Sequence, residues 1–149
     1  MLLDIFPDAR FIHIHRDPYT VYQSTRHLHV SSWKTFAFQT LDEQHLQERI
    51  LRQYKDLYDA FLDDRSLIPE GRFVELSFTE LEQEPLAQIE RVYRELALPD
   101  FATVKPEVEQ YIASLKGYKK NRHVELPEEL RKRIAMEWRR TFDEWSYPV

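Results

Sequence analysis

Arg16 and Ser24 are spaced so that both could bind one anion. Arg16 follows an alternating segment, residues 11–15, that is typical of a β-strand. Asp17 and Pro18 then favour a helix start, because Asp caps helices and Pro fits the first helical position. Ser24 falls on the same helix face as Asp17, so a guanidinium and a hydroxyl could converge on a phosphate. In a plainer interpretation, Arg16 pairs with Asp17 or another carboxylate and Ser24 binds nothing.

A second basic group comprises Lys119, Lys120 and Arg122, in a segment predicted to connect two helices. Loops carry binding residues more often than the elements they join. These side chains could therefore close over a phosphate. The alternative is an ordinary solvated loop with no ligand.

The composition limits the chemistry available to the 149 residues. Only two glycines occur, and they lie far apart, so neither a dinucleotide-binding fingerprint nor the P-loop of nucleoside triphosphatases can be built. A phosphate site must use side chains and helix ends. The chain has no cysteine, which excludes disulfides and thiolate chemistry. His13 and His15 share a strand face, but with no suitably spaced cysteine or carboxylate we predict no metal site.

The charge and hydropathy patterns limit the classes of partner and the cellular location that we expect. A net charge of -5 argues against a broad nucleic-acid surface, so we expect no nucleic-acid partner. No run approaches the roughly eighteen apolar residues of a membrane-spanning helix, and no signal peptide is visible. Together with the absence of cysteine, these features lead us to expect a cytoplasmic protein.

Periodicity predicts two strands and five or six helices. The strands are residues 11–15 and 72–77, with a turn at 69–71. Apolar spacing predicts a helix from Pro18 to about His29 and another over 42–63, whose buried stripe includes Leu46, Ile50, Tyr54, Leu57 and Phe61. A capping-box pattern predicts a helix start at Thr79, and Pro85 either restarts or bends that helix. Prolines predict further starts at 106 and 127.

Two strands make a poor sheet on their own. We therefore predict a helix-rich α/β fold in which residues 1–149 form a single, incomplete domain that flanks a larger parallel sheet.

Residues 6–18, which read FPDARFIHIHRDP, resemble the sulfotransferases that use 3′-phosphoadenosine 5′-phosphosulfate (PAPS). In that family a strand ends in Arg, often as Arg-Asp-Pro, and a Ser follows eight residues later. Arg16 and Ser24 match this spacing. Residues 72–81, RFVELSFTEL, are similar to a second family segment, although Phe78 stands where the family has Tyr.

The resemblance implies a P-loop-like parallel-sheet fold and roles for individual residues. Arg16 and Ser24 would bind the 3′-phosphate of PAPS, Phe78 would stack on adenine, and Lys119, Lys120 and Arg122 would close over the nucleotide. The matching region corresponds to the C-terminal half of a family member. The N-terminal strand-loop-helix that binds the 5′-phosphosulfate, and the usual catalytic base, have no counterpart here, so the catalytic residues stay unknown and the chain is expected to be inactive alone.

Three functions are consistent with these residues. The first is sulfuryl transfer from PAPS, as co-substrate, to a hydroxyl or amine of a small-molecule or carbohydrate acceptor. The second is a non-catalytic nucleotide-binding or interaction module derived from a sulfotransferase. Open sheet edges and apolar surface would then favour a homo-oligomer. The third is a helical interaction protein in which Arg-Asp-Pro merely starts a helix.

Overall fold

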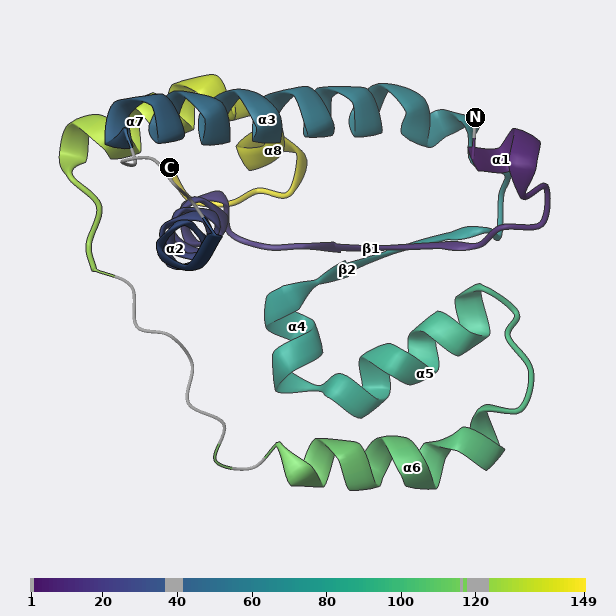
Figure 1. The fold of residues 1–149 in the computed structure, drawn as a ribbon. Helices are drawn as coiled ribbons and strands as arrows, with labels where there is room; N and C mark the ends of the chain where they lie inside the picture. Colours follow the sequence, from purple (N-terminus) through teal and green to yellow (C-terminus); the bar gives the residue numbers. More distant parts are fainter. Residues whose placement is uncertain (1, 37–41, 116, 118–123) are drawn as a thin grey trace. The chain divides into compact units, whose positions relative to one another are not determined.

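A computed structural model describes residues 2–36, 42–115, 117 and 124–149. The described chain comprises α1 (Leu2–Ile5), β1 (Phe11–His15), α2 (Pro18–Phe36), α3 (Glu43–Asp64), the short 3-10 helix η1 (Arg65–Leu67), β2 (Phe73–Ser77), α4 (Phe78–Gln83), α5 (Pro85–Glu95), α6 (Phe101–Ser114), α7 (Glu128–Glu137) and α8 (Arg139–Glu144) (Figure 1). The helix-rich α/β class predicted from the sequence is confirmed. No helix within the described ranges is long and apolar enough to cross a membrane.

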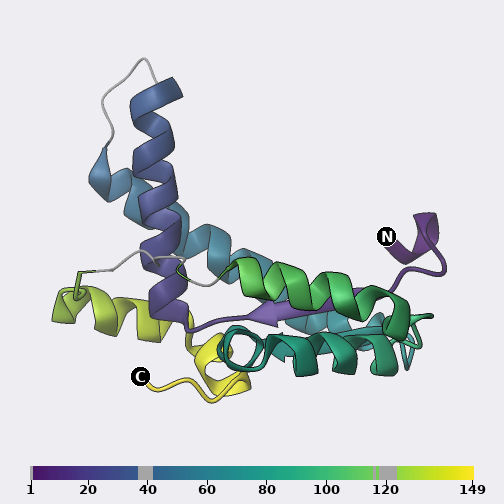
Figure 2. The same cartoon turned by 90° about the horizontal axis from the view of Figure 1, so that it is seen from below.

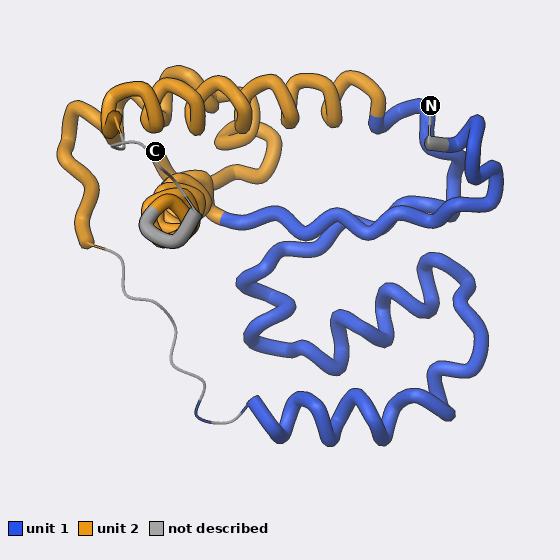
Figure 3. Tube along the Cα trace, viewed as in Figure 1, with its two compact units in different colours: residues 1–16, 65–120 blue, residues 17–64, 121–149 orange. Residues whose placement is uncertain are grey.

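The chain divides into two compact units (Figure 3). The first contains residues 1–16 and 65–120, and the second contains residues 17–64 and 121–149. The boundary falls between Arg16 and Asp17, at the point where β1 gives way to α2. Each unit has its own hydrophobic core and is described separately.

The first unit is built on a parallel pair of strands, β1 and β2, which lie side by side in Figure 2. The register pairs Ile12 with Val74 and Ile14 with Leu76, so these four side chains share one sheet face. Val74 and Leu76 are buried against Val92 and Leu96. The apolar face of α5 thereby covers the β2 side of that face.

The second unit packs α2, α3, α7 and α8 around an aromatic core. Trp138 lies at its centre, stacked on Tyr54 with ring centres 3.7 Å apart, while its indole nitrogen donates to the Leu51 carbonyl at 2.9 Å. Tyr19, Tyr22 and Phe142 complete the buried aromatic group. This hydrogen bond matters because an unpaired indole N–H or carbonyl inside a core is costly.

Most predicted elements are confirmed, although some of their ends are shifted. Residues 11–15 form β1 as predicted, and Arg72 donates its backbone N–H to Pro69 across a turn in which Gly71 has φ +75°. The helix predicted to end near His29 continues to Phe36. The helix predicted over 42–63 is α3, and the predicted start at Pro85 is that of α5.

One predicted helix start is wrong and another is shifted. The helix predicted from Thr79 is α4, which begins one residue earlier, at Phe78, so Thr79 lies inside the first turn and the predicted capping box does not form. Pro106 does not open a helix, because α6 already begins at Phe101. Pro106 removes one N–H that would have bonded the Ala102 carbonyl, and Ala102 is exposed, so water can satisfy that oxygen.

Candidate functional site

Arg16 and Phe78 occupy matching positions at one end of the sheet. The last register pair is His15 with Ser77, so Arg16 and Phe78 are the first residues beyond the carboxyl ends of β1 and β2. In open α/β sheets this is the edge at which ligands bind. Two residues that are distant in the sequence therefore lie together at the favoured place for a site.

The guanidinium of Arg16 lies over the Phe78 ring, with its central carbon 4.2 Å from the ring centre. A guanidinium held over an aromatic ring can still donate its N–H groups to an anion. Within the described chain, Arg16 has no carboxylate partner. An arginine held over a ring, with no described carboxylate partner, can bind phosphate.

The neighbouring acid, Asp17, caps the helix that follows. Its carboxylate accepts hydrogen bonds from the Thr20 backbone N–H at 2.8 Å and from the Thr20 hydroxyl at 2.7 Å. Pro18 takes the first helical position. The predicted helix start is thus confirmed in its mechanism, and the alternative pairing of Arg16 with Asp17 is not observed.

The charges on the other face of the sheet are largely balanced among themselves. Glu75 bonds the Nδ1 atom of His13 at 2.9 Å and lies 3.6 Å from an Arg65 guanidinium nitrogen. Arg91 donates to the Glu75 backbone carbonyl at 2.9 Å. The Glu75 carboxylate therefore interacts with His13 and Arg65 and does not pair with Arg16.

His15, the last residue of β1, has its pKa lowered by partial burial, an effect that the Glu75 carboxylate partly offsets. The neutral imidazole is the favoured form in the folded chain. His13 and His15 have ring centres 6.3 Å apart, and no group of three or more metal-binding side chains occurs among the described residues. His13 belongs to a polar cluster with Glu75 and Arg65. The sequence analysis did not identify this cluster, because its members lie far apart in the sequence.

The other predicted site residues are distributed as follows. Ser24 is half-buried in α2, within the second unit, whereas Arg16 and Phe78 belong to the first. Lys119, Lys120 and Arg122 lie outside the described residues. The structure brings Arg16 and Phe78 together, and the participation of the other four residues stays a prediction.

A model of the sulfotransferase family matches residues 1–102, which is more than half of the sequence. The chain belongs to the sulfotransferase family. The matched region contains both strands and the Arg16–Phe78 pair.

Among curated relatives, proteins called omega-hydroxy-beta-dihydromenaquinone-9 sulfotransferase Stf3, from Mycobacterium bovis and Mycobacterium tuberculosis, are 37% identical over 147 residues. The alignment covers 99% of this chain and 38% of each relative. The chain therefore spans less than half the length of these sulfotransferases.

The crystal structure of sulfotransferase STF9 from Mycobacterium avium is similar in fold, with a TM-score of 0.77 at 23% identity. The similarity covers 96% of this chain and 38% of that structure. The expected relationship to a sulfotransferase fold, over part of its length, is thereby confirmed.

Proposed function

We propose that this chain binds the 3′-phosphate of PAPS and serves the transfer of its sulfuryl group to a hydroxyl or amine. The observation that carries the proposal is the Arg16 guanidinium, stacked 4.2 Å from the Phe78 ring centre with no described carboxylate partner. Ser24 would add a hydroxyl donor, and Lys119, Lys120 and Arg122 would add positive charge. Adenine would stack on the face of Phe78 that Arg16 leaves open.

In the proposed reaction, the acceptor oxygen or nitrogen forms a bond to sulfur while the bond from sulfur to the 5′-phosphate oxygen breaks. Adenosine 3′,5′-bisphosphate then leaves. Binding energy from the remote 3′-phosphate can orient the reacting end of the donor. We assign no catalytic residue to this chain, so its role is to hold the nucleotide.

Calorimetric titration with adenosine 3′,5′-bisphosphate tests the proposal, with 5′-AMP as the control for the 3′-phosphate. We expect saturable binding of the bisphosphate and much weaker binding of 5′-AMP. Equal binding of the two nucleotides, or no binding by a chain with a folded circular-dichroism spectrum, would refute the assignment. Incubation with PAPS and an alcohol acceptor then separates nucleotide binding from turnover.

The second candidate is a non-catalytic, self-associating module. Ile12 and Ile14 are 51% and 45% exposed on the β1 side of the apolar sheet face. Exposed apolar side chains beside an edge strand favour association with another chain. In this proposal a second copy covers them, and Ile12→Glu should shift a sedimentation profile from oligomer toward monomer; a monomeric unmodified chain would contradict it. A cytoplasmic location stays a prediction from the sequence.

A further inference from the structure

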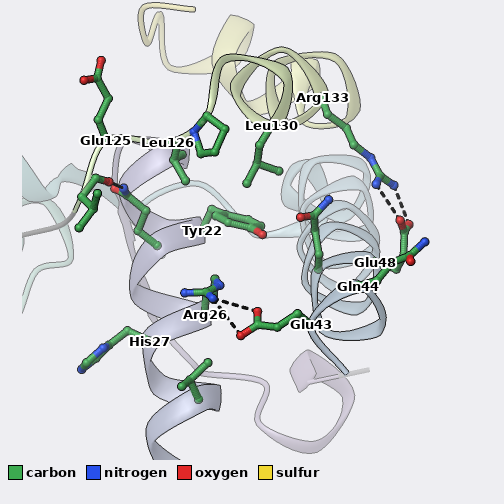
Figure 4. A pocket seen from close by; sticks show the side chains of 15 residues that line it. Tyr22, Arg26, His27, Glu43, Gln44, Glu48, Glu125, Leu126, Leu130 and Arg133 are labelled. Carbon is green, nitrogen blue, oxygen red and sulfur yellow. Dashed lines mark hydrogen bonds and ion pairs between the residues drawn. The ribbon is translucent and has the colours of Figure 1, made fainter. Parts of the chain in front are cut away.

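The second unit contains a cleft of about 710 Å³ between α2, α3 and the segment that leads into α7 (Figure 4). All of its lining residues belong to that unit. Its volume is in the range of small-molecule sites. Arg16, Ser24 and Phe78, the described residues of the proposed nucleotide site, do not line it.

The hydroxyl of a largely buried tyrosine faces this cleft. Tyr22 is only 1% exposed, and its ring packs near Trp138 with centres 6.0 Å apart. Figure 4 shows its oxygen directed into the space between α2 and α3. No hydrogen bond joins this oxygen to any described residue, and Tyr22 lies on the cleft lining, so the oxygen is open to a ligand. A ligand in the cleft could hydrogen-bond this hydroxyl.

Ion pairs balance the charges that face the cleft. One Arg26 nitrogen contacts both Glu43 carboxylate oxygens, at 3.0 and 2.9 Å. Arg133 makes a two-pronged contact with Glu48, at 2.7 and 2.6 Å. Each guanidinium is thus matched by a carboxylate. Glu125 also lines the cleft, but its side chain points away from it in Figure 4.

Polar groups without charge remain available beside an apolar wall. Gln44 and Gln47 line the cleft, and neither has a hydrogen-bond partner in the described chain. Leu126 and Leu130 are half-buried against the core and form part of the wall. Amides and a hydroxyl can donate to and accept from alcohol groups, while the leucines can contact C–H groups.

From these observations we infer that the cleft binds an uncharged ligand rich in hydroxyl groups, of the pyranoside or polyol class. An anion would have to displace Glu43 or Glu48 from its arginine, and an amine would meet no unpaired carboxylate directed into the cleft. A sugar can use the Tyr22 hydroxyl and the glutamine amides without disturbing either ion pair. This site is independent of nucleotide binding.

Titration of the full chain, without nucleotide, tests the inference by calorimetry. The probes are methyl glucoside, methyl mannoside, methyl galactoside and myo-inositol, with glucuronate and glucosamine as charged counterparts. We expect at least one neutral probe to bind with a Kd of about 10 mM or tighter, and both charged sugars to bind more weakly. If no neutral probe binds, or if a charged sugar binds best, the inference is wrong.

Three variants of cleft residues and one control variant test whether the ligand binds in the cleft. Tyr22→Phe keeps the ring and should weaken binding of the neutral probe roughly 5- to 10-fold, whereas Tyr111→Phe, at a 66% exposed tyrosine in the other unit, should not change it. Glu43→Gln leaves Arg26 unpaired and should increase the affinity for glucuronate. Gln47→Ala provides a second variant if Tyr22→Phe alters the circular-dichroism spectrum. Unchanged affinities in Tyr22→Phe or, if that variant does not fold, in Gln47→Ala would overturn the assignment.

Discussion

The guanidinium carbon of Arg16 lies 4.2 Å from the centre of the Phe78 ring, and both residues directly follow a pair of aligned strand ends. The pairing of His15 with Ser77 fixes this relationship. The strands are parallel, so their next residues emerge at the same sheet edge. The contact holds the arginine side chain at this edge of the sheet.

Arg16→Ala should weaken binding of adenosine 3′,5′-bisphosphate by roughly 10- to 100-fold, because a hydrogen bond to a charged group is worth about 1.5–3 kcal/mol. Arg94→Ala is the matched control, since Arg94 is an arginine of the same unit with a 70% exposed side chain. Calorimetry measures both variants. Equal affinities of the two variants would show that Arg16 does not bind the nucleotide.

Phe78→Leu should weaken nucleotide binding partly through Arg16. Leucine keeps an apolar contact but has no π-face, so the arginine loses its platform. A double-mutant cycle with Arg16→Ala should give a coupling of about 0.5–2 kcal/mol. Phe78→Tyr retains an aromatic face and should behave like the unmodified chain. Strictly additive effects of the two substitutions would show that the contact does not serve binding.

Replacing Lys119, Lys120 and Arg122 together with alanine should lower the affinity for the bisphosphate and reduce its dependence on salt. Each removed charge takes away one screened attraction for the phosphates. Affinity measured at low and physiological ionic strength checks this. As control, the triple variant Lys105→Ala, Arg94→Ala and Lys132→Ala removes the same number of charges elsewhere. An identical salt dependence in both triple variants would contradict the prediction.

The free energy of unfolding should fall as the pH drops below the ordinary histidine value of 6.5. Burial lowers the pKa of His15, and burial together with the Arg49 guanidinium lowers the pKa of His29. The unfolded chain then binds protons that the folded chain does not, so stability is complete above 6.5 and is lost toward the lower folded-state pKa values.

Urea unfolding at about pH 7.5 and about pH 5.5 measures this slope. His15→Gln with His29→Gln should flatten the slope over that window. His45→Gln, at an exposed histidine, is the control and should leave the slope unchanged. A slope of the same size in the double variant would mean that other groups control the pH dependence.

Trp138→Phe should lower the free energy of unfolding by about 2–4 kcal/mol. Phenylalanine leaves the buried Leu51 carbonyl without the indole donor at 2.9 Å and fills less of the space beside Tyr54. Met136→Ala, at a side chain 72% exposed, should change stability by less than about 0.5 kcal/mol. Denaturant titration compares the two, and similar losses would show that Trp138 is not a central core residue.

The sequence predicts elements well where neighbouring residues decide them. Alternation over residues 11–15 predicts β1, and the Asp17 cap followed by Pro18 predicts the start of α2. Such signals act within one strand or one helical turn. The prediction of a helix start at Pro106 was wrong because α6 tolerates this proline. The cost of a proline inside a helix depends on whether the carbonyl four residues earlier can reach water, and the sequence does not show this.

The rotation of a helix within its unit depends on its neighbours. Leu57 fits the apolar stripe predicted for α3, yet it is 64% exposed, whereas Leu51 is fully buried beneath the Trp138 indole. Periodicity shows that a helix has an apolar face but does not set how far that face extends. The packing of α7 and α8 against α3 determines which of its apolar side chains are buried.

By itself the sequence determined the family, the strand before Arg16, and the residue types suited to a phosphate. The tertiary structure alone decided that Arg16 contacts Phe78, that Glu75 is occupied by His13 and Arg65, and that the Tyr22 hydroxyl opens into a charge-balanced cleft. The physical reason is distance along the chain. Local preferences act over a few residues, whereas strand register and helix packing join side chains that lie tens of residues apart.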